Sequence, residues 1–288
     1  VAWVIVDNVL HLPLVICSRP ILAIPGGVVT YNGTQTQAYS GQTLYFPAGT
    51  HTIPIRFPVQ SNATVFLHRD AWIIGSFNCV SNLGGHAIRG YGAISGEWAE
   101  SIRLSIRSMD YATQLTYSLI YGHPELASDA TLYGVTLIDA PFYTTAYGIT
   151  IWDRIAICSS WWGNANGIFT AVQQTTKAAS ISRCALWTHD DAIDFGEYVG
   201  AVATSQNAIC ALSASFVVAY WPSEDQKRRH VSTNDTVICI NYWVPGVGSI
   251  ILVWCDGGAH STGGGTLDDA RAQVVSGVTF SGTRFMGT

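Results

Sequence analysis

The feature that most constrains the fold of this chain is a short run of β-branched and aliphatic residues that returns between turns rich in glycine, asparagine and serine. The run at residues 133–138 (YGVTLI) returns at 153–158 (DRIAIC) and at 179–186 (ASISRCAL), so that its starts lie 20 and then 26 residues apart. Later echoes occupy residues 235–240 and 275–280. A period of this size is typical of solenoids, in which no coil can bury its apolar face alone and each coil stacks on its neighbours.

These runs predict an all-β chain, because strand-like segments bounded by turn residues recur throughout and helical periodicity is nearly absent. We expect a right-handed parallel β-helix over residues 27–288. Residues 1–26 would form an N-terminal cap on the first coil or the end of a preceding β module. Long loops are expected at residues 221–234 and 255–273, where the spacing becomes irregular. A β-sandwich with Greek-key turns is the alternative fold.

The composition narrows the classes of function. Charged residues make up 11% of the chain, against about 25% in typical globular proteins. A net charge of −5, with only one short basic cluster at residues 227–229, argues against a nucleic-acid partner. No apolar run reaches the roughly 18 residues that a membrane span requires. Three Asn-x-Thr sequons, at Asn32, Asn62 and Asn234, favour a secreted, extracellular glycoprotein.

The seven cysteines are dispersed along the chain, and no two of them form a Cys-x-x-Cys pair. A zinc cluster is therefore not expected, and no metal site is predicted. Two interpretations of the cysteines stay open: buried small hydrophobic residues within strands, or one or two disulfides with an odd thiol left over.

An adjacent pair of carboxylates, Asp190 and Asp191, points most directly to chemistry. Neighbouring carboxylates repel each other, so one tends to keep its proton to a higher pH than the other. Glycoside hydrolysis needs this division of roles, with an acid for the leaving oxygen and a base for the water. A solvated turn or a calcium ligand is the alternative interpretation of such a pair taken alone.

Several segments, taken in order, resemble glycoside hydrolase family 49, the dextranase and isopullulanase family of the pectin-lyase-like β-helix group. The matching segments are residues 44–51 (LYFPAGTH), 65–77 (VFLHRDAWIIGSF), 88–97 (IRGYGAISGE), 138–142 (IDAPF) and 188–193 (THDDAI). Polygalacturonases share a similar double aspartate, but their Gly-His-Gly and Arg-Ile-Lys motifs are not visible in this sequence. They are therefore the second choice.

The resemblance implies a polysaccharide substrate, such as dextran or pullulan, and an inverting reaction without a cofactor. Asp190 would be the general acid, and Asp191 would help to hold or activate the water. The family has a third aspartate upstream, and Asn166 stands at the matching position. An amide can orient a water molecule but cannot take its proton at neutral pH. His189, Trp162 and Trp187 are the further candidates for contact with the sugar.

Two functions from different classes follow from these observations. The first is a secreted glycoside hydrolase that acts on a polysaccharide. The second is a catalytically degenerate β-helix that binds carbohydrate or serves as a structural, filament-forming extracellular subunit, because uncapped solenoid ends favour self-assembly. Structural roles are favoured for two more carboxylates: Asp139 capping a turn, with a position in the cleft as the alternative, and Asp194 in a ladder of stacked coils, with a sugar contact as the alternative.

Overall fold

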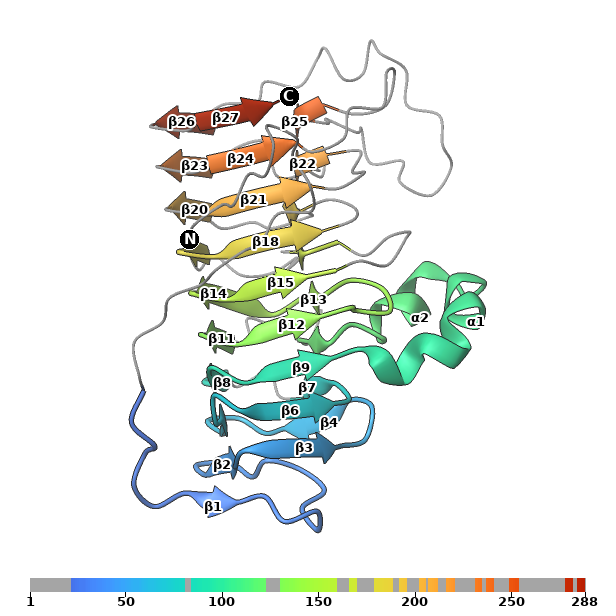
Figure 1. Cartoon of the computed structure of the whole chain (residues 1–288), viewed down its shortest axis with the longest axis vertical. Coiled ribbons are helices and arrows are strands. Elements are labelled where there is room, and N and C mark those ends of the chain that lie inside the picture. Colours follow the sequence, from blue (N-terminus) through green and yellow to red (C-terminus); the bar gives the residue numbers. More distant parts are fainter. Residues whose placement is uncertain are drawn as a thin grey trace, which may run out of the picture.

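The computed structural model describes residues 22–80, 84–122, 130–159, 166–169, 179–188, 192–195, 202–205, 207–211, 216–220, 231–234, 237–240, 249–253, 278–281 and 284–287 of the 288-residue chain. Within these ranges the chain winds through three parallel sheets of ten, nine and eight strands, which are called sheets A, B and C here. Successive strands of one sheet come from successive coils, which rise as a stack in Figure 1. The predicted right-handed parallel β-helix is confirmed, and the β-sandwich alternative is wrong.

Within the described ranges each complete coil contributes one strand to each sheet, whereas β1 extends sheet A alone and the last coil adds β26 to sheet A and β27 to sheet B. Sheet A contains β1 (Val29–Thr30), β2 (Thr43–Phe46), β5 (Thr64–Leu67), β8 (Ala87–Gly90), β11 (Ala130–Tyr133), β14 (Ile149–Asp153), β17 (Ala179–Ser182), β20 (Val202–Ser205), β23 (Val231–Asn234) and β26 (Val278–Ser281). Sheet B contains β3 (Gly49–Thr52), β6 (Ala71–Ile74), β9 (Ala93–Ser95), β12 (Thr136–Ile138), β15 (Ala156–Cys158), β18 (Ala185–Thr188), β21 (Ala208–Ala211), β24 (Val237–Ile240) and β27 (Arg284–Gly287). Sheet C contains β4 (Phe57–Val59), β7 (Phe77–Cys79), β10 (Ile120–Tyr121), β13 (Thr145–Ala146), β16 (Ile168–Phe169), β19 (Ile193–Phe195), β22 (Phe216–Tyr220) and β25 (Ser249–Val253).

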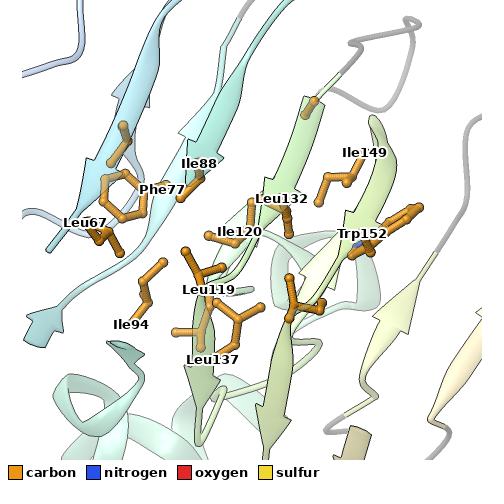
Figure 2. Close-up of a cluster of buried hydrophobic side chains, with 14 of the residues drawn as sticks. Leu67, Phe77, Ile88, Ile94, Leu119, Ile120, Leu132, Leu137, Ile149 and Trp152 are labelled. Carbon is orange, nitrogen blue, oxygen red and sulfur yellow. The ribbon is translucent and has the colours of Figure 1, made fainter. Parts of the chain in front are cut away.

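The strands form because their alternating apolar residues stack into continuous inward ladders. In sheet B one inward residue per strand is in register with the next, and the described, fully buried members of this ladder are Ile73, Ile94, Leu137, Ile157 and Leu186. Leu67, Ile88, Leu132 and Trp152 from sheet A meet Phe77 and Ile120 from sheet C across the same interior (Figure 2). Because each coil buries its residues only against its neighbours, the core is a column that runs along the stack.

Aromatic residues fill the first coils. The rings of Phe46, Phe57 and Phe77 meet edge to face, with centroids 5.9 to 6.4 Å apart. Tyr31, which follows β1, stacks on Phe46 with centroids 4.4 Å apart and is itself buried. This ring covers the lower end of the apolar column, the end at which the prediction places a cap. The predicted boundary between residues 26 and 27 remains a prediction, since residues 1–21 lie outside the described ranges.

The corner between sheets A and B is made by a single residue with positive φ in several coils. Gly134, Arg154 and Arg183 occupy this position, with φ values of 80°, 57° and 56°. At this corner Asp153 accepts hydrogen bonds from both Nε and Nη2 of Arg183 in the next coil, which ties the two coils together. Because this corner is only two residues long in these coils, it leaves little room for an insertion. The helical insertion instead follows a strand of sheet B.

A helical insertion follows β9 and was missed by the sequence prediction of a nearly helix-free chain. It consists of a 3₁₀ helix, η1 (Glu97–Ile102), and two short α-helices, α1 (Arg103–Arg107) and α2 (Tyr111–Leu115). Asp110 caps α2, because its side chain accepts a hydrogen bond from the Thr113 amide. The insertion projects from the side of the stack where the strands of sheet B end (Figure 1).

One further sequence prediction needs correction. Residues 231–234, assigned to a long loop, form β23, whereas residues 221–230 and 255–273 lie outside the described ranges. The echo at residues 275–280 contains the start of β26 in sheet A, whereas the runs at 133–138 and 153–158 end in strands of sheet B. Strands on either side of a corner share the same apolar alternation, so the pattern alone does not distinguish the two sheets.

Candidate functional site

Two of the sequence-predicted site residues lie within the described ranges: Trp187 in β18, and Asn166 two residues before β16. Asp190, Asp191 and His189 lie outside the described residues, as does Trp162. The structure describes the residues on both sides of the acidic pair: β18 ends at Thr188, and Ala192 immediately precedes β19. Both Thr188 and Ala192 are fully buried in the coil.

Asn166 lies two residues before β16 in the preceding coil. Its carbonyl oxygen accepts a hydrogen bond from the Thr144 amide at 2.8 Å, and the Ile168 amide donates to the Ala192 carbonyl at 3.0 Å. Ile168 pairs in register with Ile193. The Asn166 side chain is 3% exposed, and at this level of burial it is part of the coil wall rather than a surface side chain.

Trp187 is the other predicted site residue that the structure describes. It is the third residue of β18 and pairs in register with Cys158 of β15, which in turn pairs with Ile138 of β12. The residue before it, Leu186, points into the core, so Trp187 points outward and is half-buried. Trp187 is one residue from the end of β18 and three residues before Asp190 in the chain.

The outward face of sheet B is uncharged over its first six strands. Its outward positions in strand order are Thr50 and Thr52, Trp72 and Ile74, Ala93 and Ser95, Thr136 and Ile138, Ala156 and Cys158, and Ala185 and Trp187. Trp72, which sequence reasoning did not select, is half-buried, and its indole Nε1 donates to Glu97 Oε1 at 3.3 Å. The alternation of inward and outward residues along β6 could have identified Trp72, because it lies two residues from Ile74 on the same face of the strand.

A carboxylate and a guanidinium lie together at the end of β12. Asp139 directly follows this strand with φ of 49°, and its amide donates to the Cys158 carbonyl at 2.9 Å. Burial and the neighbouring Arg107 lower the pKa of Arg103 on α1, while the negative charge of Asp139 acts in the opposite direction. Asp139 therefore has a cationic neighbour from the helical insertion. The turn-capping role assigned to Asp139 from the sequence remains a prediction, as does the ladder role of Asp194, whose side chain is outside the described part.

The remaining predictions concern thiols, metals and glycans. Cys79 and Cys184 are buried thiols outside any disulfide, as expected of small core residues, and Cys158 is half-buried. Among the described residues there is no cluster of His, Cys, Asp and Glu that could hold a metal ion. Asn32 and Asn62 are exposed, as a glycan acceptor must be, and Asn234 ends β23. No helix within the described ranges is both long and apolar enough to cross a membrane.

Comparisons with known proteins identify the fold. No family model and no curated protein matches this chain. Among solved structures, Dex49A from Penicillium minioluteum matches with a TM-score of 0.52 at 15% identity, over 90% of this chain and 62% of that one. Endo-xylogalacturonan hydrolase from Aspergillus tubingensis matches with a TM-score of 0.50 at 11% identity, over 91% and 93%. Polygalacturonase from Erwinia carotovora subsp. carotovora matches with a TM-score of 0.50 at 12% identity, over 93% and 95%.

These neighbours are pectin-lyase-like glycoside hydrolases. At identities of 11 to 15% the likeness establishes that this chain shares their β-helix fold, and nothing finer. The chain also spans less than two thirds of the length of the Penicillium protein.

Proposed function

We propose that this chain is a secreted glycoside hydrolase of the family 49 type that cleaves a neutral α-glucan, such as dextran or pullulan, with inversion of configuration. Asp190 protonates the leaving oxygen, Asp191 helps to hold or activate the attacking water, and no cofactor takes part. The observation that carries the proposal is the register of the coils. In consecutive coils Asn166 lies two residues before β16, and residues 189–191 connect β18 to β19, which pairs with β16; this supports a site at that edge.

The outward face of sheet B supports a neutral substrate. Its first six strands present alanine, threonine, isoleucine and tryptophan but neither lysine nor arginine. A polyanionic chain such as a galacturonan would find no positive charge on this face, and the acidic pair would repel it. A neutral glucan meets neither obstacle, and its apolar sugar faces can stack on tryptophan. Trp187 therefore contacts the substrate in this proposal, together with Trp162 and His189.

The test is the release of reducing sugar from dextran, pullulan, arabinan and polygalacturonate. We expect activity on a neutral glucan and none on polygalacturonate. Asp190→Asn removes the proton donor, so its kcat should fall by about 10² to 10⁴. Glu100→Gln is the matched control, because it neutralises an exposed carboxylate on η1 and should leave the rate unchanged. Equal rates for wild type and Asp190→Asn would exclude the proposed hydrolysis. So would a wild type that releases no reducing sugar from any of the four polysaccharides.

The buried amide of Asn166 favours one alternative, a degenerate β-helix that binds carbohydrate without cleaving it. Asn166→Asp distinguishes the hydrolase from the binding protein, because it adds a carboxylate at the position where the resembled family has one. A hydrolase limited by the missing carboxylate should gain rate in this variant, whereas a binding protein should gain none. Binding of dextran without hydrolysis by both proteins would establish the alternative.

A further inference from the structure

Trp72 and Glu97 form a pair on the outward face of sheet B that the proposed catalysis does not use. Trp72 is the second residue of β6 and lies on the outward side of the strand, because its neighbour Ile73 is fully buried in the core. The indole Nε1 of Trp72 donates a hydrogen bond to Oε1 of Glu97 at 3.3 Å. Glu97 is exposed, whereas Trp72 is half-buried. A large aromatic ring and a carboxylate are thus held together at the surface of the stack.

The position of Glu97 shows how the indole lies. Trp72 pairs in register with Ala93, the first residue of β9, whereas Glu97 comes two residues after Ser95, the last residue of that strand. The extended chain from Ala93 to Ser95 alone spans about 7 Å, so the indole reaches Glu97 only by leaning along the strand. A ring that leans along the sheet turns one face to the strand and the other to solvent, which agrees with the half-buried state of Trp72. Ser95, an outward residue of β9, is only 2% exposed, as expected beneath such a ring.

The backbone around Glu97 holds the carboxylate in place. The Glu97 amide donates a hydrogen bond to Oγ of Ser95 at 3.3 Å. Trp98, the next residue of η1, stacks on Tyr117 with ring centroids 6.3 Å apart, which ties the start of the helical insertion to the segment after α2. A carboxylate offers about four acceptor positions, and the Trp72 indole uses one of them. Because Glu97 is exposed, the other positions are open to a ligand.

The ring and the carboxylate match the two kinds of surface that a neutral sugar presents. The C–H face of a pyranose is apolar and stacks on an indole, while the hydroxyl groups at its edge donate hydrogen bonds to a carboxylate. The outward residues in line with Trp72 on the neighbouring strands are Thr50, Ala93 and Thr136, which are short and uncharged, so a flat ring can reach the indole. A polyanionic chain would instead be repelled by Glu97.

Trp187 lies on the same face, farther along the stack. Its strand, β18, follows β6 in sheet B after β9, β12 and β15 (Figure 1). At about 4.8 Å per coil, Trp72 and Trp187 are therefore about 19 Å apart along the stack. The outward positions of the three strands between them carry no charged residue. One polysaccharide chain laid along this face can contact both rings, which a single sugar unit cannot.

We propose that Trp72 and Glu97 form a carbohydrate-binding subsite that holds one unit of a neutral polysaccharide chain. The indole stacks on the apolar face of the sugar, and the carboxylate accepts hydrogen bonds from its hydroxyl groups. The choice of a neutral glucan rests on the proposed function. The subsite itself binds without making or breaking a covalent bond, so binding measurements test it separately from hydrolysis.

The test measures the dissociation constants for dextran, pullulan and polygalacturonate by affinity gel electrophoresis. For the neutral glucan that the wild type binds more tightly, we expect Trp72→Ala and Glu97→Ala each to raise the Kd by about tenfold. Trp72→Phe keeps a ring and should raise it less. The double variant should cost less than the two single changes combined, because the two side chains act as one unit. Tyr39→Ala and Glu100→Ala are the matched controls, since they remove an exposed ring and an exposed carboxylate elsewhere, and both should bind as the wild type does.

The outcomes separate the subsite from the hydrolase. If Trp72→Ala and Glu97→Ala bind as tightly as the wild type, the subsite is wrong, whatever the hydrolytic activity. A wild type that binds neither glucan, or that binds polygalacturonate more tightly, also overturns the inference. If the wild type binds a glucan, these variants bind it weakly and nothing is cleaved, the subsite stands and the proposed hydrolase fails. If Trp72→Ala loses the native circular dichroism spectrum, Glu97→Ala decides, because truncation of an exposed side chain leaves the core intact.

Discussion

The inward ladder of sheet B makes a quantitative prediction about stability. Ile157 is 1% exposed and lies in register between Leu137 and Leu186, both of which are also fully buried. Ile157→Ala removes three buried carbon atoms, at about 0.8 kcal/mol for each in lost transfer free energy, or about 2.4 kcal/mol. The cavity left between the two leucines adds to this cost, so the free energy of unfolding should fall by about 3 to 4 kcal/mol.

Ile151 provides the matched control. It is an isoleucine of the neighbouring strand β14, and it is 41% exposed because it points outward from sheet A. Ile151→Ala leaves no internal cavity and should cost about 1 kcal/mol or less, mainly in strand propensity. Urea unfolding followed by far-UV circular dichroism gives both free energies. Equal costs for the two variants, or a larger cost for Ile151→Ala, would refute the assignment of inward and outward faces.

Two further predictions test buried groups and corners. Burial raises the pKa of both Cys79 and Cys184 to about 12, so at pH 8 both remain thiols rather than reactive thiolates. We expect neither to react with a thiol reagent in the native protein and both to react after unfolding, as peptide mass spectrometry would show. Reaction of either in the native state would contradict its placement in the core. Gly90→Ala should cost about 3 kcal/mol, because its φ is 115° and its Cβ would lie 2.0 Å from the Leu67 carbonyl oxygen. Gly33→Ala, with φ of 87° and nothing within 4 Å, should cost about 1 kcal/mol, and similar melting temperatures for the two variants would contradict the predicted contact.

The stacked coils could be predicted from the sequence because one physical requirement repeats in every coil. Each strand of sheet B must bury one aliphatic side chain on the residue below it, which places Ile94, Leu137, Ile157 and Leu186 at recurring positions. This requirement fixes the alternation along each strand and hence the fold class. It does not fix which sheet a strand joins: the echo at residues 275–280 contains the start of β26 in sheet A, whereas the runs at 133–138 and 153–158 end in strands of sheet B.

The helical insertion could not be predicted by the same reasoning. Its three helices have six, five and five residues, which is too short for a period of 3.6 to become visible. The local signal that was available is Asp110, a helix-capping residue one position before α2. Without the insertion the sequence gives no reason to bring Arg103 to Asp139, and Asp139 was therefore interpreted as a turn residue.

The candidate site could be predicted in part. The matching segments placed Asn166 at the position of the family's upstream aspartate, and the structure describes Asn166 as a buried residue two positions before β16. Trp187 was selected for its nearness to the acidic pair, and its outward direction follows from Leu186 pointing inward. The roles of Asp190 and Asp191 remain predictions, because both residues lie outside the described ranges.

The most direct test of the proposed inverting hydrolysis is the configuration of the first product. Proton NMR of the anomeric region, recorded during early hydrolysis of the preferred α-glucan, reports it before mutarotation. The account predicts that the β-anomer of the new reducing end appears first and then equilibrates. Initial appearance of the α-anomer would mean retention, which requires two carboxyl groups only about 5–5.5 Å apart and a covalent intermediate, and it would contradict the account.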